Sequence, residues 1–440
     1  MSDLFDSFRQ AHAELPSLHA GLAASRQQAL NTLLQAGLPG PRSETWKYTS
    51  LRALARHRFA PATATASIED LRQKLADVPG PRAVFVNGRF SDELSMLADL
   101  PQGVSLRSMA AAADAGDAAA LSTFAHTADD SSAVFALANS ALAVDGVQLK
   151  VAAGAAVKSP LHLVLVSDGG ALQAGEKAPA SGIAWHLRHQ IEIEAGAEVC
   201  LVQHEFSLGQ GLSLGTAVAQ LRLADSSSLQ HLRVQQLAAG CSYFQRNQVE
   251  IGAKARYQRL DLELGLGLSR HELNVQLAAA GAFLRADGVL LGSGAAHCDT
   301  RLGIVHAAPD CECQLTWRGL GDDRSRVAFH GGITINEGAD GSEAMLSNKN
   351  LLLSEQAEVD TQPVLIIHAD EVKAAHGATV GRLDPTALFY LQSRGLPADQ
   401  ARQLLTAAFC RELLTAVADE SLREMLTARL DAALSREEVA

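Results

Sequence analysis

The middle of the chain repeats a short pattern of apolar positions. Between residues 133 and 382, two apolar residues with one residue between them are followed, after a gap of five residues, by a third apolar residue. Because side chains at i and i+2 of a strand face the same side, each unit predicts the end of one strand, a turn and the start of the next strand. The matches are Leu149/Val151/Val157, Ile191/Ile193/Val199, Leu221/Leu223/Leu229, Val249/Ile251/Tyr257, Val275/Leu277/Phe283 and Leu351/Leu353/Val359.

Stacking of these units predicts a mainly β protein with a solenoid core. Each unit has one apolar face that only a neighbouring unit can cover, so successive units laid on one another form a continuous core. Aromatic residues make up only 5% of the chain, so we expect this core to consist mainly of Ala, Val, Leu and Ile side chains. A β-sandwich, whose strands also alternate in polarity, is the alternative fold for the same pattern.

Helical patterns flank the repeats on both sides. On the N-terminal side, leucines recur with helical spacing up to Gly37, and residues 81–90 predict a strand hairpin around the turn Asn87-Gly88. The chain therefore divides into an N-terminal helical region with a short strand hairpin (1–105), an Ala/Asp-rich linker (106–132), a β-helix core (133–382) and a C-terminal helical domain (383–440).

The C-terminal domain has clear helix signals. Asp384 is a candidate N-cap, and Pro385 suits the first helical position. A second helix is expected from about Pro397. Its predicted apolar face consists of Ala401, Leu404, Leu405, Ala408 and Phe409.

Composition and charge narrow the classes of function. The 440 residues are 47% hydrophobic and 20% charged, and the formal net charge of −12 argues against general binding of nucleic acid or an anionic membrane. No stretch approaches the roughly 20 apolar residues that cross a bilayer. The N-terminus lacks the apolar segment of a secretory signal, and six scattered cysteines fit a reducing cytoplasm better than a disulfide framework.

Motifs of common catalytic sites are absent from the sequence. There is no G-x-x-x-x-G-K-[ST] phosphate-binding loop and no G-x-S-x-G nucleophile elbow. The pairs His204-Glu205 and His271-Glu272 lack the second histidine of a zinc-protease helix. We therefore expect a protein that is not an enzyme.

Soft metal ligands gather in one segment, which contains His297, Cys298, His306, Cys311 and Cys313. Thiolate and imidazole are ligands for zinc or for an iron–sulfur cluster. Structural zinc sites generally have two cysteine pairs, however, whereas this segment has a single C-x-C, and buried cysteine often packs as a small apolar side chain. Packing is the favoured role, and Cys298, Cys311 and Cys313 are kept as the weaker candidates for metal.

His376 is the second candidate, in the segment 373–381 that precedes the C-terminal helices. The glycines of this segment suggest a backbone that another group can approach closely. By its local sequence alone, His376 is more often an edge histidine in a turn than a ligand.

Several ordered motifs occupy the C-terminal part of the chain. They are SNKNLLLS (347–354), AEVDTQP (357–363), IHADEVK (367–373), HGATVG (376–381) and FYLQSRGL (389–396). In this order they resemble the SufB/SufD family, the paired scaffold subunits of SUF iron–sulfur cluster assembly. The segment Trp46–Thr49 adds weaker support. The HGATVG form is similar to the D-type subunit, whereas the B-type carries a cysteine and acidic residues around this point.

The resemblance implies a right-handed parallel β-helix flanked by helical domains. It also implies a cytoplasmic, non-catalytic scaffold in a complex with one B-type subunit and two copies of an ABC-like C-type ATPase. No cofactor is expected to stay bound to the isolated chain, and a transient iron–sulfur cluster is expected in the complex. A homodimer of the isolated chain is a further expectation. Flavin binding in the complex is compatible with the resemblance, and no motif in the sequence predicts it.

By the same resemblance, His376 faces a cysteine of the B-type subunit and is a ligand of the nascent cluster. Many D-type members have a cysteine two residues earlier, where this chain has Ala374, so histidine is the candidate ligand at this end. Docking of the ATPase is assigned to Phe389, Tyr390, Ser393, Arg394 and Gly395.

Two alternatives are kept. One is a B-type subunit, which the absence of cysteine at positions 374–376 disfavours. The other is a β-helix enzyme that acts on polysaccharide. Such an enzyme would need clustered carboxylates and aromatic side chains for sugar stacking, and the repeat region is poor in aromatic residues.

Overall fold

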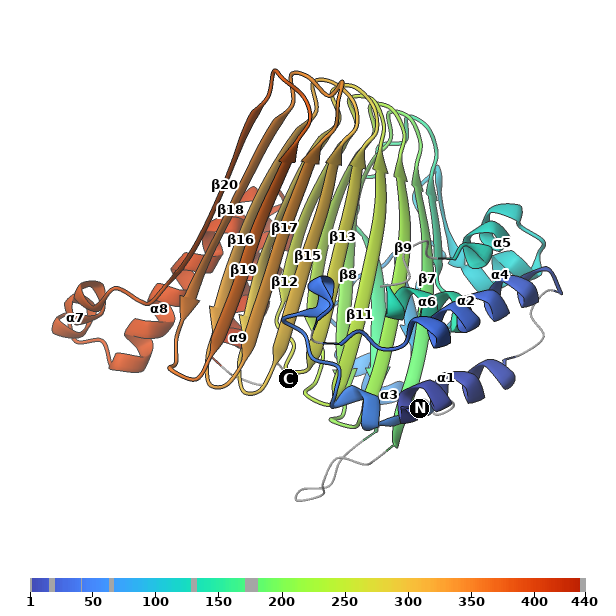
Figure 1. The fold of residues 1–440 in the computed structure, drawn as a ribbon, viewed down its shortest axis with the longest axis horizontal. Helices are drawn as coiled ribbons and strands as arrows, with labels where there is room; N and C mark the ends of the chain where they lie inside the picture. Colours follow the sequence, from blue (N-terminus) through green and yellow to red (C-terminus); the bar gives the residue numbers. More distant parts are fainter. Residues whose placement is uncertain are drawn as a thin grey trace.

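Two long β-sheets face each other along the molecule, and the chain passes from one sheet to the other at each turn (Figure 1). The computed structural model describes residues 2–15, 20–40, 42–62, 67–127, 133–170 and 181–435. Parallel strands stacked in this way confirm the predicted β-solenoid with helical regions at both ends, and they exclude the β-sandwich.

Sheet A consists of β1 (Arg58–Pro61), β4 (Val104–Ser108), β5 (Val147–Val151), β7 (Ser181–Ile193), β9 (Ser213–Leu223), β11 (Cys241–Ile251), β13 (Leu268–Leu277), β15 (His297–His306), β17 (Arg326–Ile335) and β19 (Glu358–Ile367). Its strand order is β19-β17-β15-β13-β11-β9-β7-β5-β4, with β1 also paired to β7.

Sheet B consists of β2 (Arg82–Val86), β3 (Arg89–Phe90), β6 (Leu161–Asp168), β8 (Glu198–Leu208), β10 (Ser228–Gln236), β12 (Arg256–Glu263), β14 (Phe283–Gly292), β16 (Glu312–Gly321), β18 (Glu343–Leu352) and β20 (Lys373–Gly381). Its order is β20-β18-β16-β14-β12-β10-β8-β6-β2-β3. The hairpin predicted at 81–90 is the antiparallel pair β2–β3.

The helices are α1 (Asp3–Ala13), α2 (Ala23–Ala36), α3 (Ile68–Lys74), α4 (Met109–Asp114), α5 (Ala118–Ala125), α6 (Val134–Leu142), α7 (Pro385–Ser393), α8 (Ala398–Arg411) and α9 (Glu420–Ser435). Short 3-10 turns are η1 (Ala20–Leu22), η2 (Glu44–Trp46), η3 (Leu54–Arg56) and η4 (Glu412–Ala416). Within the described ranges, no helix has the length and apolarity needed to cross a membrane.

The corners from sheet A to sheet B explain the repeated apolar pattern. Each pattern except Leu351/Leu353/Val359 ends a strand of sheet A, turns and leads into the next strand of sheet B. The third residue after the sheet A strand has a positive φ at Gly154 (70°), Gly196 (67°), Ser226 (58°) and Lys254 (56°). A left-handed residue at the same place in successive corners lets the turns stack on one another.

Two of the matched units are placed differently in the structure. Tyr257 is the register partner of Leu284, which is fully buried, and not of Phe283. The corner between β13 and β14 has one residue more than the earlier corners, so a fixed five-residue gap selects the wrong side chain. Leu351 and Leu353 pack outward against the C-terminal helices, at a corner from sheet B to sheet A.

The N-terminal region covers the outer face of sheet A near its first strands. Phe5, Trp46 and Phe135 pack in one cluster with Leu214 and Phe244 of the sheet. Residues 106–132, which we expected to form a linker, contain α4 and α5, and residues 128–132 lie outside the described part of the chain.

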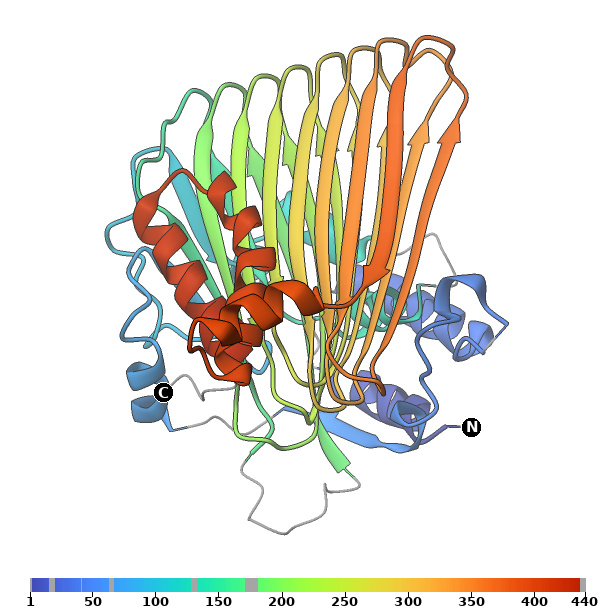
Figure 2. The same cartoon turned by 90° about the vertical axis from the view of Figure 1, so that its left-hand side faces the viewer.

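The C-terminal helices α8 and α9 lie against the outer face of sheet B (Figure 2). Leu413 and Leu426 pack there with Leu262 and Val289. As predicted, Asp384 caps α7, since its carboxylate accepts a hydrogen bond from the amide of Thr386 (2.9 Å).

The predicted apolar face of α8 is partly wrong. Leu404 is 46% exposed, whereas Ala401, Ala407 and Cys410 are buried. The helix meets its neighbours through small side chains, which allow close approach, and turns this leucine toward solvent.

Charged side chains fill part of the solenoid interior. The fully buried side chain of Arg233 contacts Glu205 (Nη2 to Oε2, 2.6 Å), Asp261 (Nη1 to Oδ1, 3.6 Å) and Glu263. Arg259 donates two hydrogen bonds to Asp261, of 2.7 and 2.8 Å. Because adjacent turns supply opposite charges, these groups are paired although they are inside the protein.

Trp317 lies between these buried charged side chains and the last turns of the solenoid. Asp261, Gly288 and Trp317 are register partners on β12, β14 and β16. A Cβ at Gly288 would lie 2.3 Å from the indole ring, so glycine is required beneath Trp317.

Candidate functional site at the open end of the solenoid

The last turn leaves each sheet with a free edge. Among the residues that the structure describes, β19 pairs only with β17 and β20 only with β18, and both strands lie at one end of the solenoid (Figure 1). Ile366 (45% exposed), Ile367 (42%) and Val380 (44%) add apolar surface to these edges. Unpaired strand edges with apolar flanks are surfaces on which another chain can add strands.

His376 occupies a core position of this last turn. Its register partner in β18 is Leu346, which is 4% exposed and pairs in turn with Leu315, which is 1% exposed. In-register parallel strands place such side chains on the same side, so His376 faces the interior side of the solenoid. It is nevertheless exposed, because no further turn of the described chain lies over β20.

The space around His376 is open. Within the described part of the chain, its imidazole has no hydrogen-bond or ion-pair partner. A Cβ built on Gly377 would have no heavy atom within 4 Å. Ala374, on the same side of the strand, is half-buried against the core. The imidazole is therefore free to bind a borderline metal ion that approaches from outside the last turn.

Hydrogen bonds between side chains hold the neighbouring strands in place. The Thr361 hydroxyl of β19 donates to Asn348 Oδ1 (2.7 Å), which also accepts from Asn350 Nδ2 (2.6 Å). Asn350 Nδ2 also donates to the carbonyl of Thr379 in β20 (3.0 Å). The backbone next to His376 is thus tied to both sheets.

The cysteines of the segment 297–313 are placed in the solenoid wall. Cys298 lies in β15 of sheet A and Cys313 in β16 of sheet B, and both are buried. Burial raises the pKa of both thiols to about 12, so they are protonated at neutral pH, whereas metal ligation uses the thiolate. The Cys311 thiol lies 3.3 Å from the carbonyl oxygen of Ala279.

These features favour packing as the role of the three cysteines. Among the residues that the structure describes, no group of three or more His, Cys, Asp and Glu side chains could hold a metal ion. His306 is fully buried, and burial lowers its pKa to about 4.

The segment Trp46–Thr49 attaches the N-terminal region to sheet A. The guanidinium of Arg270 lies 3.8 Å from the centre of the Trp46 ring. The Thr49 hydroxyl donates to Asp299 Oδ2 (2.6 Å) and lies 2.9 Å from His297 Nε2, which therefore acts as the donor to Thr49. This motif has a structural role, and its hydrogen bond from His297 Nε2 to Thr49 leaves that nitrogen unavailable to a metal ion.

The residues assigned to ATPase docking lie on and directly after α7. Phe389 is 71% exposed and Tyr390 56% exposed, and α7 has no buried residue. Arg394 donates to the Tyr390 hydroxyl (3.0 Å), and Ser393 donates to the Tyr390 carbonyl (2.8 Å). Gly395 has a φ of 94° and ends the helix. In Figure 1, α7 stands away from both sheets.

Sequence reasoning quoted Ile367 and Val380 only within family motifs and did not predict that these residues and Ile366 are exposed at the strand edges. The available signal was the apolar run Val364–Ile367, which directly follows a family motif and lies in the last strand of sheet A. An apolar run of this kind predicts a buried strand. Only the strand order shows that no other described strand pairs with the outer edge of β19.

Comparison with known proteins agrees with these features. The family model described as "SUF system FeS cluster assembly, SufBD core domain" matches residues 176–409, and that of the "SufBD protein N-terminal region" matches residues 1–163. The iron–sulfur cluster assembly protein SufD of Escherichia coli is 30% identical over 92% of this chain and 91% of its own.

Two further relatives extend the comparison. A SufBD family protein of Synechocystis is 28% identical over 92% of this chain and 89% of its own, and the SufD protein of Bacillus subtilis is 27% identical over 49% of each chain. The core model covers more than half of the chain and includes the open end with His376. The chain thus belongs to the SufBD family, the scaffold proteins of SUF iron–sulfur cluster assembly.

Proposed function

We propose that this chain is the D-type subunit of a SUF scaffold and pairs with a B-type subunit through β19 and β20. The two free edges and the exposed apolar residues beside them support this proposal. A partner that adds strands to both sheets would bond the free backbone groups of the edges and cover Ile366, Ile367 and Val380.

His376 serves as a ligand of the nascent cluster, which is the cargo of the scaffold. The observation that carries this role is the place of His376 at the exposed end of a column of core residues, between two free sheet edges. One imidazole cannot hold a cluster, so thiolates of the partner complete the set. Imidazole is neutral and leaves the cluster with less negative charge than thiolate does, which suits a scaffold that must release its product.

The ATPase subunit docks on α7 through Phe389 and Tyr390. Exposed aromatic side chains are typical anchors of protein interfaces, and these two lie on a helix that contributes nothing to the core. The chain itself supplies the cluster ligand and the docking surface, while ATP hydrolysis belongs to the partner.

The test is His376→Ala in the assembled complex of D-type, B-type and ATPase subunits. We expect normal assembly by size-exclusion chromatography and normal ATP hydrolysis, with loss of cluster formation measured by absorbance and by iron and sulfide content. His368→Ala is the matched control, because His368 is also exposed and lies in the turn between β19 and β20.

Normal cluster yield with His376→Ala would overturn the role of this residue. Failure of the wild-type chain to bind any B-type subunit would overturn the pairing itself.

A further inference from the structure

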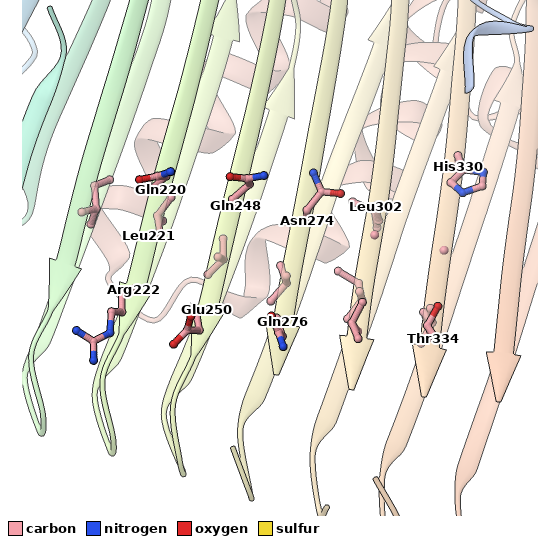
Figure 3. Close-up of a pocket in the computed structure, with 18 of the residues that line it drawn as sticks. Gln220, Leu221, Arg222, Gln248, Glu250, Asn274, Gln276, Leu302, His330 and Thr334 are labelled. Carbon is pink, nitrogen blue, oxygen red and sulfur yellow. The ribbon is translucent and has the colours of Figure 1, made fainter. Parts of the chain in front are cut away.

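A long groove crosses the outer face of sheet A (Figure 3). Its volume is about 730 Å³, and its floor runs over seven strands, from β7 to β19. Two rows of register partners line it. The amide row consists of Gln190, Gln220, Gln248 and Asn274, and the charged row consists of Glu192, Arg222, Glu250 and Gln276. Both rows reach the open end at β19, on the outer face of sheet A, whereas His376 faces the interior side of the solenoid from β20.

The length of the groove fits an extended chain. Seven strands have six spacings of about 4.8 Å between them, so the groove is roughly 29 Å long. An extended polypeptide rises about 3.3 Å per residue, so a segment of roughly nine residues spans this length.

The chemistry of the lining favours polypeptide over other polymers. Side-chain amides offer both donors and acceptors, which match the N–H and C=O groups of a peptide backbone. Glu192 is paired with Lys150 (3.4 Å), and Arg222 and Glu250 have opposite charges, so the lining lacks the excess positive charge that nucleic acid requires. None of the described lining residues is Phe, Tyr or Trp, on which sugars would stack.

The end of the groove next to β19 is mostly apolar. The amide row continues there with Gly303, Gly332 and Val364, and the charged row with Val305, Thr334 and Ile366. A Cβ at Gly303 would lie 2.7 Å from Asn274 Oδ1, so glycine leaves room for the Asn274 side chain to lie over β15. An apolar side chain of a bound segment can pack at this end against Val364 and Ile366.

A buried donor at the same place lacks a partner. Asn274 Nδ2 is shielded from solvent and has no hydrogen-bond partner in the described residues, and the same holds for His330 Nδ1. Asn274 and His330 both line the groove. Burial of the Asn274 amide without a bond costs about 1–3 kcal/mol, and rotation of this side chain toward the groove lets a backbone carbonyl of a bound chain accept from it.

We propose that this groove binds an extended segment of the B-type partner subunit. The inference rests on the proposed function, which places that subunit at the free edge of β19, and the groove reaches this same strand. The segment enters over β19, places an apolar side chain beside Val364 and Ile366, and runs across the strands toward β7.

Site-specific photo-crosslinking tests this proposal. The full chain with p-benzoylphenylalanine at position 248, in the middle of the amide row, is mixed with purified B-type subunit and irradiated. Mass spectrometry should map the adduct to one continuous segment of that subunit. The same probe at Gln258, a half-exposed glutamine on the outer face of sheet B, should give no adduct with that segment.

A substitution gives a second readout. Gln248→Trp fills the groove on a strand that accepts aromatic residues, so we expect the affinity for the B-type subunit to fall about tenfold. Gln258→Trp should leave the affinity unchanged. Far-UV circular dichroism and the thermal midpoint of both variants check that the solenoid is intact.

The outcomes separate the two proposals. If the complex forms but position 248 gives no adduct, the groove proposal is wrong and the pairing at the edges stands. An adduct with a second copy of this chain, or unchanged affinity of Gln248→Trp, also overturns it. If no complex forms with the wild-type chain, the proposed pairing fails, and the groove proposal fails with it.

Discussion

Replacing Arg233 by methionine would test how the solenoid tolerates charge in its interior. The Arg233 side chain is completely buried and contacts Glu205, Asp261 and Glu263. Methionine keeps much of the side-chain length and removes the positive charge. The three carboxylates then share only the positive charge of Arg259, which bonds directly to Asp261.

The expected loss can be worked from these contacts. Removing one partner of a buried ion pair costs about 3–5 kcal/mol, because a charge stays buried without compensation. Asp261 keeps its two hydrogen bonds from Arg259, and Glu205 keeps the hydroxyl of Tyr243 (3.0 Å). Glu263 keeps a 3.4 Å bond from Ser269 and lies 3.9 Å from His271 Nδ1. Because burial holds the pKa of His271 well below its usual value, this imidazole supplies no positive charge and Glu263 carries most of the penalty. We expect the free energy of unfolding to fall by about 3–5 kcal/mol at neutral pH.

The loss should depend on pH. Burial already raises the pKa of Glu263, and the charge of Arg233 opposes this shift. Without Arg233 the pKa of Glu263 rises further, so the folded variant takes up a proton more readily than the unfolded chain does. Stability then returns as pH falls toward the unfolded pKa of about 4.3, by up to about 1.4 kcal/mol per pH unit.

Urea unfolding followed by far-UV circular dichroism at about pH 8 and about pH 5.5 measures both effects. Arg222→Met is the matched control, because Arg222 lies on β9, the preceding strand along the chain, and is exposed, and it should change stability by no more than about 0.5 kcal/mol. Replacing Glu205 and Glu263 by glutamine in the Arg233→Met background should restore part of the loss. A loss below about 1 kcal/mol at both pH values would refute the reasoning.

Two further predictions concern the C-terminal helix and the cysteines. Phe389→Ala combined with Tyr390→Ala should change stability by about 0.5 kcal/mol or less, because both side chains are exposed, and should abolish capture of the ATPase subunit in a pull-down. Undiminished capture would contradict docking on α7. Cys311→Ser combined with Cys313→Ser should lower stability by about 1–3 kcal/mol without changing metal content, because the new hydroxyls replace thiols in the apolar core. Stoichiometric zinc that is present in the wild type and lost in this variant, measured by elemental analysis, would show instead that the cysteines bind metal.

Strand and turn patterns were readable from the sequence because they are local. Alternation of side chains along a strand depends only on the backbone, so apolar pairs such as Ile191/Ile193 marked the inner face of a strand. The signals at Asp384 and Pro385 likewise predicted the start of α7. His376 was found through its family motif, since nothing in its local sequence distinguishes it from an ordinary edge histidine.

Stacking decided what the local pattern could not. One extra residue in a corner moved the core position from Phe283 to Leu284, because register depends on the length of the whole turn. Arg233 and Asp261 lie inside the solenoid, which no local pattern predicted, because strands one turn apart supply opposite charges.

The candidate site and the groove also depend on the order of the strands. His376 is exposed only because β20 is the last strand of its sheet, and a further turn would bury it as Leu346 is buried. Gln220 and Gln248 are far apart in the sequence and become neighbours through the pairing of β9 with β11. The sequence by itself was enough to predict the β-solenoid and the family to which the chain belongs. The free edges, the buried charges and the rows of the groove come from the stacking of coils, because that stacking sets which side chains meet and which remain uncovered.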